Sequence, residues 1–206
     1  MKNPPPYNPL EKSHLAESVA NALLGQPAGP LPPSRRFDGA GVYAIYYAGL
    51  YEPYKRIRQQ NIDGMWDSPI YIGRAVPSGS RRGTPNSDAP VGDVLHNRLR
   101  QHARSIDQAT NLSLGDFACR YLVVDDIWIP LAETMLIQRY WTSAVWNSLL
   151  DGFGIHDPGS GRRQQRRSAW DTVHPGRPFA AGLPDSSQPA EEWKERIVAS
   201  LAARSD

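Results

Sequence analysis

Cysteine is nearly absent from this sequence, since Cys119 is the only one among 206 residues. A single thiol cannot close an internal disulfide and cannot supply a cysteine-rich zinc site. No apolar run approaches the roughly 20 residues that span a bilayer, and the opening MKNPPPYNP lacks the apolar core of a signal peptide. We therefore expect a cytoplasmic protein with no membrane segment and one main domain, long enough to bury a core.

The sequence also carries little excess charge. Its formal net charge of +2 does not by itself indicate a nucleic-acid-binding protein. The arginines are nevertheless concentrated in residues 74–104, where six of them are balanced only by Asp88 and Asp93. Such a cluster can contact DNA phosphates, although a solvated basic surface explains it about equally well. The six are Arg74, Arg81, Arg82, Arg98, Arg100 and Arg104.

Two stretches have the composition of β-strands. The first contains Gly-Val-Tyr at residues 41–43 and the second contains Tyr-Ile-Gly at residues 71–73, both among β-branched and aromatic residues with turn formers at the ends. Tyrosines alternate with apolar residues, so one face is expected to pack while the other presents phenols, including those of Tyr43 and Tyr71. A phenol can relay a proton or hydrogen-bond a phosphate oxygen.

The segment between these strands, residues 50–68, is too long for a hairpin turn and is expected to hold a short helix. It interleaves aromatic residues such as Tyr51 and Tyr54 with cations such as Arg56 and Arg58. That pattern suits base stacking and phosphate contact. An ordinary solvent-exposed helix or a dimer surface explains it somewhat better.

Residues 92–106 form an amphipathic pattern that predicts a helix with Asp93 at its start. Arg98 and His102 stand at positions i and i+4, so they lie on one face beside the apolar stripe. A guanidinium can clamp a phosphate, and an imidazole can take or give a proton near neutral pH. The alternative is a rim histidine and a surface arginine without a joint role.

A third strand is predicted over residues 116–124 and a helix over residues 131–141. Glu133 shares the apolar face of that helix with Leu136 and Ile137. A buried carboxylate needs a cation or several hydrogen-bond donors. Hydrated Mg²⁺ held together with a substrate phosphate would satisfy it, and a salt bridge to Arg98 is the structural alternative.

The flanking regions differ from this core in composition. A helix over residues 13–24 and a Pro/Gly linker over residues 26–33 come before it. A Gly-rich, basic and irregular stretch follows at residues 151–177, and a helix is expected from about residue 189. We expect an α+β fold (an α/β sandwich), with a small, mainly antiparallel sheet flanked by helices. The expected units are residues 1–33, 34–150 and 151–206.

The order of these pieces resembles the GIY-YIG nuclease superfamily. Gly-Val-Tyr, Tyr-Ile-Gly, Arg-x-x-x-His on a helix, a glutamate opening a later helix and then Asn147 follow one another between residues 39 and 147. The stretches LPPSRRFDGAGVYAIYY, PIYIGRAVP and WNSLLDGFGIHDPGSGR…HPGR look like the type II restriction endonucleases of this superfamily that cut CCGCGG. That likeness covers the chain except about its first thirty and last twenty residues.

The resemblance implies roles for six residues. Tyr43 would orient or deprotonate the attacking water with His102 as its proton partner, Tyr71 would hold the scissile phosphate or the water, and Arg98 would neutralise charge on the phosphoryl oxygens. Glu133 would bind a single Mg²⁺ or Mn²⁺ that stabilises the leaving 3′ oxygen. Asn147 would contact the phosphate or a neighbouring side chain. Residues 141–145 depart from the family pattern, since they replace its proline-bearing turn before Trp-Asn.

A palindrome implies a two-fold dimer on double-stranded DNA, in which each subunit cuts one strand. Guanines are read by Arg or Lys, although most such residues contact phosphates. The candidates are Arg74, Arg81, Arg82, Arg162, Arg163, Arg166 and Arg167.

Other interpretations remain open at this point. The chain could be a repair or homing nuclease of the same superfamily, or a non-cleaving, regulatory DNA-binding protein that retains the scaffold. Asp185 and Glu192 have the spacing of a PD…ExK nuclease, but they fall in a Pro/Ser loop and in the first turn of a helix. We interpret that match as chance.

Overall fold

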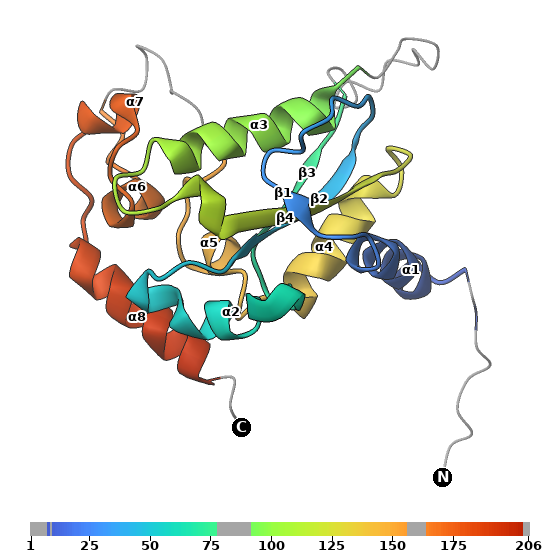
Figure 1. Cartoon of the computed structure of the whole chain (residues 1–206), viewed down its shortest axis with the longest axis horizontal. Coiled ribbons are helices and arrows are strands. Elements are labelled where there is room, and N and C mark those ends of the chain that lie inside the picture. Colours follow the sequence, from blue (N-terminus) through green and yellow to red (C-terminus); the bar gives the residue numbers. More distant parts are fainter. Residues whose placement is uncertain (1–7, 9, 78–91, 156–163, 204–206) are drawn as a thin grey trace.

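The computed structural model describes residues 8, 10–77, 92–155 and 164–203, and it has a four-stranded sheet at its centre (Figure 1). The sheet consists of β1 (Gly29–Pro30), β2 (Gly41–Tyr47), β3 (Pro69–Ala75) and β4 (Phe117–Val123). Their order is β1-β4-β2-β3, and every neighbouring pair is antiparallel. The predicted α+β fold is therefore confirmed, and β3 lies at one edge of the sheet.

Helices cover both faces of the sheet (Figure 1). α3 (Val94–Asp107) packs on one face, where Leu95 and Leu99 join the larger core. α1 (Lys12–Leu24) and α4 (Ile129–Arg139) lie side by side on the other face, around a smaller core. Because neither face meets water, all seven residues of β2 are buried.

The expected exposed row of phenols on β2 is therefore wrong. Tyr43 and Tyr47 point into the larger core, and Tyr46 points into the smaller one. The alternation of the side chains follows the predicted period of two. What the pattern could not indicate is that helices far along the chain would cover both faces.

The Pro/Gly linker contributes an unpredicted strand. Gly29 and Pro30 form β1 opposite Cys119 and Ala118 of β4. Proline is tolerated here because β1 lies at the sheet edge, where its missing N–H removes no bond from a central ladder.

The insertion between β2 and β3 folds compactly and contains the predicted helix, α2 (Lys55–Gln59), between the 3₁₀ turns η1 (Glu52–Tyr54) and η2 (Ile62–Gly64). Tyr54 is completely buried, so it takes no part in base stacking and lies on neither of the surfaces considered for this segment, a solvent-exposed helix or a dimer surface. Arg56 Nη1 donates to the carbonyl oxygens of Leu201 and Ala202 at 3.2 and 3.3 Å. This arginine therefore caps the C-terminal helix.

The remaining predicted elements begin and end within a few residues of the expected positions, and the last of them is α8 (Ala190–Ala202). α1 starts after Glu11, not at Ser13. Asp93 directly precedes α3, as predicted, but its carboxylate accepts from Arg36 Nε at 2.9 Å and from Asn97 Nδ2 at 2.6 Å and does not cap the helix. Four short elements were not predicted: η4 (Leu114–Asp116), α5 (Val145–Ser148), α6 (Ala169–Val173) and α7 (Pro178–Ala181).

The segment after residue 150 packs into the larger core. Phe153, Trp170 and Ile197 belong to the same buried cluster as Tyr43 of β2. Within the part of the chain that the structure describes, no helix is both long and apolar enough to cross a membrane.

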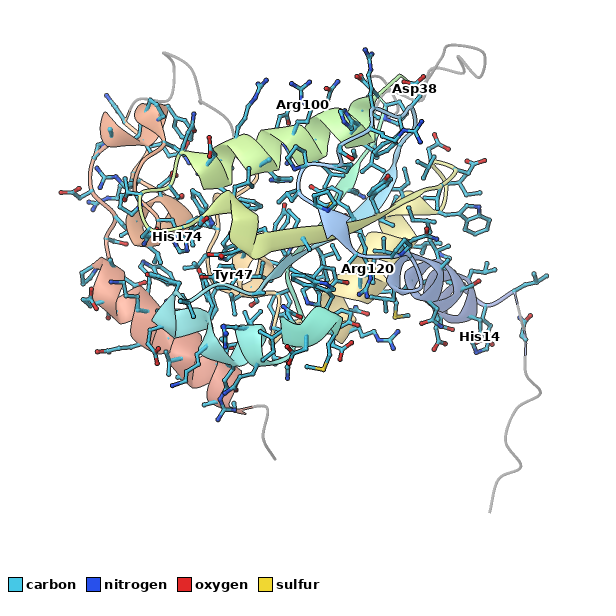
Figure 2. All side chains as sticks on the ribbon, viewed as in Figure 1. His14, Asp38, Tyr47, Arg100, Arg120 and His174 are labelled. Atoms are coloured by element: carbon cyan, nitrogen blue, oxygen red, sulfur yellow. The ribbon has the colours of Figure 1, made fainter. Side chains whose placement is uncertain are left out.

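A buried Tyr–His pair joins the insertion to this segment. Tyr54 Oη and His174 Nε2 are 2.6 Å apart, and Trp146 Nε1 donates to Tyr54 Oη at 2.7 Å. His174 Nδ1 lies 3.0 Å from Asn111 Oδ1. His174 is completely buried beside α6 (Figure 2), and this burial lowers its pKa from 6.5 to about 3.

We expect this histidine to make the fold acid-sensitive. Between pH 6.5 and about 3 the unfolded chain protonates His174 and the folded chain does not. Stability is therefore complete above the higher value and falls by about 1.4 kcal/mol for each pH unit below it. Urea unfolding at pH 7, 6, 5 and 4 measures this slope. His174→Gln should flatten the curve, and an equal slope in that variant would contradict the assignment to His174.

Candidate active site

Tyr43 and His102 form a second buried Tyr–His pair, this one between β2 and α3. Tyr43 Oη and His102 Nε2 are 2.6 Å apart, and both side chains are almost completely excluded from solvent. Tyr43 lies directly opposite Gly73 in the β2–β3 ladder. A β-carbon at Gly73 would collide with the Tyr43 hydroxyl. The glycine of Tyr-Ile-Gly thus makes room for the phenol of the other tripeptide.

Tyr71 and Arg98 stand beside this pair. The Tyr71 ring lies 6.2 Å from the Tyr43 ring and 5.2 Å from the His102 ring, centroid to centroid. Arg98 Nη2 donates to the carbonyl oxygen of Gly154 at 3.0 Å. A β-carbon at Gly154 would lie 2.9 Å from Arg98 Nη2 and 3.1 Å from Tyr71 Oη. The Arg98 guanidinium and the Tyr71 hydroxyl therefore both lie next to Gly154.

The side chain of Glu133 lies near Tyr71 and Arg98, although its helix packs on the opposite face of the sheet. Its helix, α4, packs on the smaller core, whereas Tyr43 points into the larger one. β3 is an edge strand, so a side chain can pass around it. A cleft of about 480 Å³ lies there and is lined by Tyr71, Arg74, Ala75, Val76, Val94, Asn97, Arg98, Gln101 and Glu133. The predicted phenol, guanidinium and carboxylate thus share one opening.

The carboxylate of Glu133 has a cationic partner, but not the one expected. Its Oε2 lies 3.0 Å from Arg74 Nε, and Glu133 is partly exposed. The sequence suggested Mg²⁺, or Arg98 as the structural alternative, whereas this ion pair is with Arg74, which extends from β3 beside α4. Burial raises the pKa of Glu133 above its ordinary value, and the Arg74 charge lowers it in part.

The two phenols are harder to ionise than free tyrosine. Burial raises the pKa of Tyr43 well above 10, and the nearby Tyr71 raises it further, whereas Arg98 lowers it. Burial also raises the pKa of Tyr71, against the opposing effect of Arg98. Both phenols are therefore protonated at neutral pH.

The side chain of Asn147 hydrogen-bonds the backbone of the edge strand β3. Its Oδ1 accepts from the backbone N–H of Ile72, and its Nδ2 donates to the carbonyl of Ile72, both at 2.8 Å. The described hydrogen bonds of this amide are thus with the backbone of the residue next to Tyr71, whereas the resemblance implied a contact with the phosphate or with a neighbouring side chain. This geometry makes Asn147 a support for β3.

Phe153 and Gly154 are site residues that the sequence did not single out. The Phe153 ring stacks on the His102 imidazole, with centroids 4.5 Å apart and an angle of 18°. The residues lie in a stretch without periodicity, so no pattern placed them. Two signals pointed to this region without naming a residue: the irregularity of residues 151–177, which indicated a loop shaped around something, and the stretch WNSLLDGFGIHDPGSGR, which carries part of the resemblance.

The predicted DNA-contacting arginines are spread over several places. Arg74 lines the cleft. Arg166 is exposed, while Arg167 Nη1 lies 3.5 Å from Asp185 Oδ1 and so ties its segment to the loop before α8. Arg81, Arg82, Arg162 and Arg163 lie outside the described residues. On α3, Arg100 points away from the sheet (Figure 2).

The residues of the rival PD…ExK pattern do not meet at the cleft. Glu192 lies in the first turn of α8, and Asp185 is the partner of Arg167. Neither residue lines the cleft. Chance remains our interpretation of their spacing.

The described residues contain no cluster of three or more His, Cys, Asp or Glu side chains that could hold a metal ion alone. The cleft does present the single carboxylate of Glu133 next to open space. That donor set fits a hydrated Mg²⁺, which keeps several waters and takes one or two carboxylates together with substrate phosphates.

Comparison with known proteins agrees with this geometry. A model of the family described as the Eco29kI GIY-YIG domain matches residues 35–201, which is most of the chain. No curated protein matches the chain. The match begins between β1 and β2 and ends inside α8, so it includes β2, β3 and β4, the residues that line the cleft and most of the C-terminal segment. The chain therefore belongs to the Eco29kI GIY-YIG family of DNA endonucleases.

Proposed function

We propose that this protein is a type II restriction endonuclease that hydrolyses phosphodiester bonds in double-stranded DNA at a short GC-rich palindrome, CCGCGG, with one divalent metal ion. The observation that carries the proposal is the shared cleft at the edge of the sheet. It brings Glu133 from one face to Tyr71 and Arg98 from the other. A single phosphate placed there can meet all three side chains.

Tyr43 and His102 are the proposed proton-transfer pair. The buried phenol is protonated at neutral pH, so it cannot deprotonate the attacking water as a ready-formed phenolate. It can pass its proton to His102 Nε2, 2.6 Å away, while it takes one from the attacking water. Because Tyr43 is completely buried, Tyr71 or the backbone at Gly154 must shift to admit that water.

Arg98 and Tyr71 are the proposed phosphate ligands. Arg98 presents its guanidinium to the cleft, and the Gly154 carbonyl holds one end of it. Fixed donors of this kind stabilise the charge that builds on phosphoryl oxygens in the transition state. The Tyr71 hydroxyl stands beside the guanidinium and can donate to a third oxygen.

Glu133 is the proposed metal ligand. When bound, Mg²⁺ or Mn²⁺ supplies Lewis-acid stabilisation of the leaving 3′ oxygen. In this structure Arg74 forms an ion pair with the Glu133 carboxylate. A DNA phosphate that binds Arg74 instead would leave Glu133 free to bind the metal. The two arginines and one acid leave the cleft with a positive balance, which suits a DNA phosphate.

A homodimer on the DNA is the remaining part of the proposal. A palindrome is read by two subunits related by a two-fold axis. Arg166 is an exposed candidate for a base or phosphate contact, as are the undescribed Arg81, Arg82, Arg162 and Arg163. Light scattering of the protein with a CCGCGG duplex should give two chains per duplex, and one chain per duplex would contradict the dimer.

Digestion of a plasmid of known sequence tests the activity. With Mg²⁺ we expect discrete fragments whose ends fall within CCGCGG, and with EDTA we expect intact plasmid. Fragments that end at another palindrome would support the restriction activity and refute CCGCGG as the recognition sequence. A metal-independent gel shift without cleavage would instead indicate a DNA-binding regulator, and cuts dependent on branched or damaged DNA would indicate a repair nuclease.

A further inference from the structure

A buried ion pair lies behind the loop that follows α5. Arg177 and Asp171 are 1% and 2% exposed. Arg177 Nε donates to Asp171 Oδ1 at 2.6 Å, and its Nη2 donates to Oδ2 at 2.7 Å. Neither residue lines the cleft. Fold stability alone is a weak reason for such a pair, because apolar residues of similar volume often serve as well.

The other donors of Arg177 all go to one loop. Its Nη2 donates to the carbonyl of Gly152 at 2.8 Å, and its Nη1 donates to those of Phe153 and Ile155 at 3.2 and 3.0 Å. The guanidinium is itself held between aromatic rings, with Cζ 4.6 Å from the centroid of Trp170. A guanidinium presents its donors in a rigid fork. One side chain thereby fixes three carbonyl groups within four residues.

The opposite side of the same loop touches the proposed catalytic groups. Phe153 stacks on the His102 ring at 4.5 Å and meets the Tyr71 ring edge-on at 4.9 Å. The next residue, Gly154, accepts a hydrogen bond from Arg98 Nη2 at 3.0 Å. Two consecutive loop residues therefore contact three of the proposed catalytic side chains, and Arg177 holds the carbonyl between them.

We propose that Arg177 is a positioning residue of the active site: by fixing the loop at residues 152–155, it holds Phe153 against His102 and the Gly154 carbonyl against Arg98. Asp171 orients the guanidinium, and Ser168 Oγ in turn donates to Asp171 Oδ2 at 2.7 Å. This inference rests on the proposed hydrolysis at the cleft and assigns a role within it to the C-terminal segment.

Arg177→Lys in the full-length protein is the first test. Lysine keeps the charge but offers no planar fork, so it cannot hold the carboxylate and three carbonyls together. We expect the single-turnover cleavage rate at saturating protein to fall on the order of 100-fold, because small displacements of catalytic groups have that effect. The affinity for the same duplex, measured by fluorescence anisotropy without divalent metal, should stay unchanged.

Arg120→Lys is the matched control. Arg120 is also an arginine that ties backbone carbonyls together, those of Gln26 and Trp66, at 2.8 and 2.7 Å. It lies against Tyr46, which points into the smaller core. We expect Arg120→Lys to lower the melting temperature and to leave the cleavage rate as in the wild type. Should Arg177→Lys not fold, Phe153→Leu removes the ring that Arg177 holds, and the same loss of rate is expected.

The aromatic NMR signals of His102 give a measurement that does not depend on cleavage. A stacked ring shifts the imidazole protons, whose signals can be assigned by their loss in His102→Gln. They should move in Arg177→Lys and in Phe153→Leu, but not in Arg120→Lys. Unchanged signals and an unchanged cleavage rate in Arg177→Lys would overturn the inference. If the wild type cleaves no DNA, the proposed function fails, and the NMR comparison still decides whether Arg177 positions the loop.

Discussion

Glu133→Ala is expected to lower the rate of DNA cleavage by on the order of 10³-fold, because the loss of a metal ligand removes several kcal/mol of transition-state stabilisation. Among the residues that the structure describes, Glu133 is the only acid that lines the cleft. Its ion pair with Arg74 is partly exposed and contributes about 1 kcal/mol or less to stability. The variant should therefore fold normally. It should still bind the duplex, because Arg74 and Arg98 remain.

The matched control is Glu192→Ala, which removes an acid of the rival PD…ExK pattern from α8. Single-turnover cleavage with Mg²⁺ and gel shifts without metal should be measured for both variants. We expect Glu192→Ala to cleave as the wild type does. Loss of cleavage in Glu192→Ala alone would overturn the assignment of the metal ligand and move the active site to the C-terminal region.

Tyr43→Phe is expected to lower the cleavage rate by about 10²- to 10⁴-fold, the usual contribution of a positioned acid–base group. The substitution keeps the ring that fills the space opposite Gly73 and removes only the hydroxyl. His102 Nε2 then loses a hydrogen bond of 2.6 Å in a buried place. We expect a loss of stability of about 1–3 kcal/mol in addition.

Tyr54→Phe separates catalysis from stability. The described part of the chain has two buried Tyr–His hydrogen bonds of 2.6 Å, and that of Tyr54 with His174 lies away from the cleft. Removing the Tyr54 hydroxyl also takes the acceptor from Trp146 Nε1. The Tyr54→Phe variant should therefore be the less stable of the two, yet it should cleave at the wild-type rate below its melting temperature. Equal losses of rate in both variants would show that Tyr43 acts through stability alone.

Much of this site could be predicted because its residues sit on regular elements. The tripeptides at residues 41–43 and 71–73 lie on adjacent strands, and the i, i+4 spacing put Arg98 and His102 on one face of α3. Their meeting was implied by the resemblance, since no local pattern states which helix crosses which strand. The ion pair of Glu133 with Arg74 could not be predicted, because it depends on β3 being an edge strand.

The loop at residues 152–155 could not be predicted for a different reason. Three of its carbonyl groups accept hydrogen bonds from the Arg177 guanidinium, more than twenty residues further along the chain, and no local pattern indicates such a partner. Tyr54 shows the same limit, since a tyrosine among cations suggested a DNA-stacking surface, whereas Trp146 and His174 draw it into the core. Both the loop and Tyr54 thus have their partners far away in the sequence, where a local pattern does not indicate them.

The sites of cutting on DNA of known sequence test most directly whether the phenol, imidazole, guanidinium and carboxylate act on one phosphodiester. The ends produced by the wild type, Tyr43→Phe and Glu133→Ala should be sequenced after digestion with Mg²⁺. We predict wild-type ends at a single position within one repeated GC palindrome on both strands, and few or no such ends with either variant in the time that the wild type needs to cut all of the DNA. Wild-type ends that persist unchanged in both variants would place the chemistry outside this cleft.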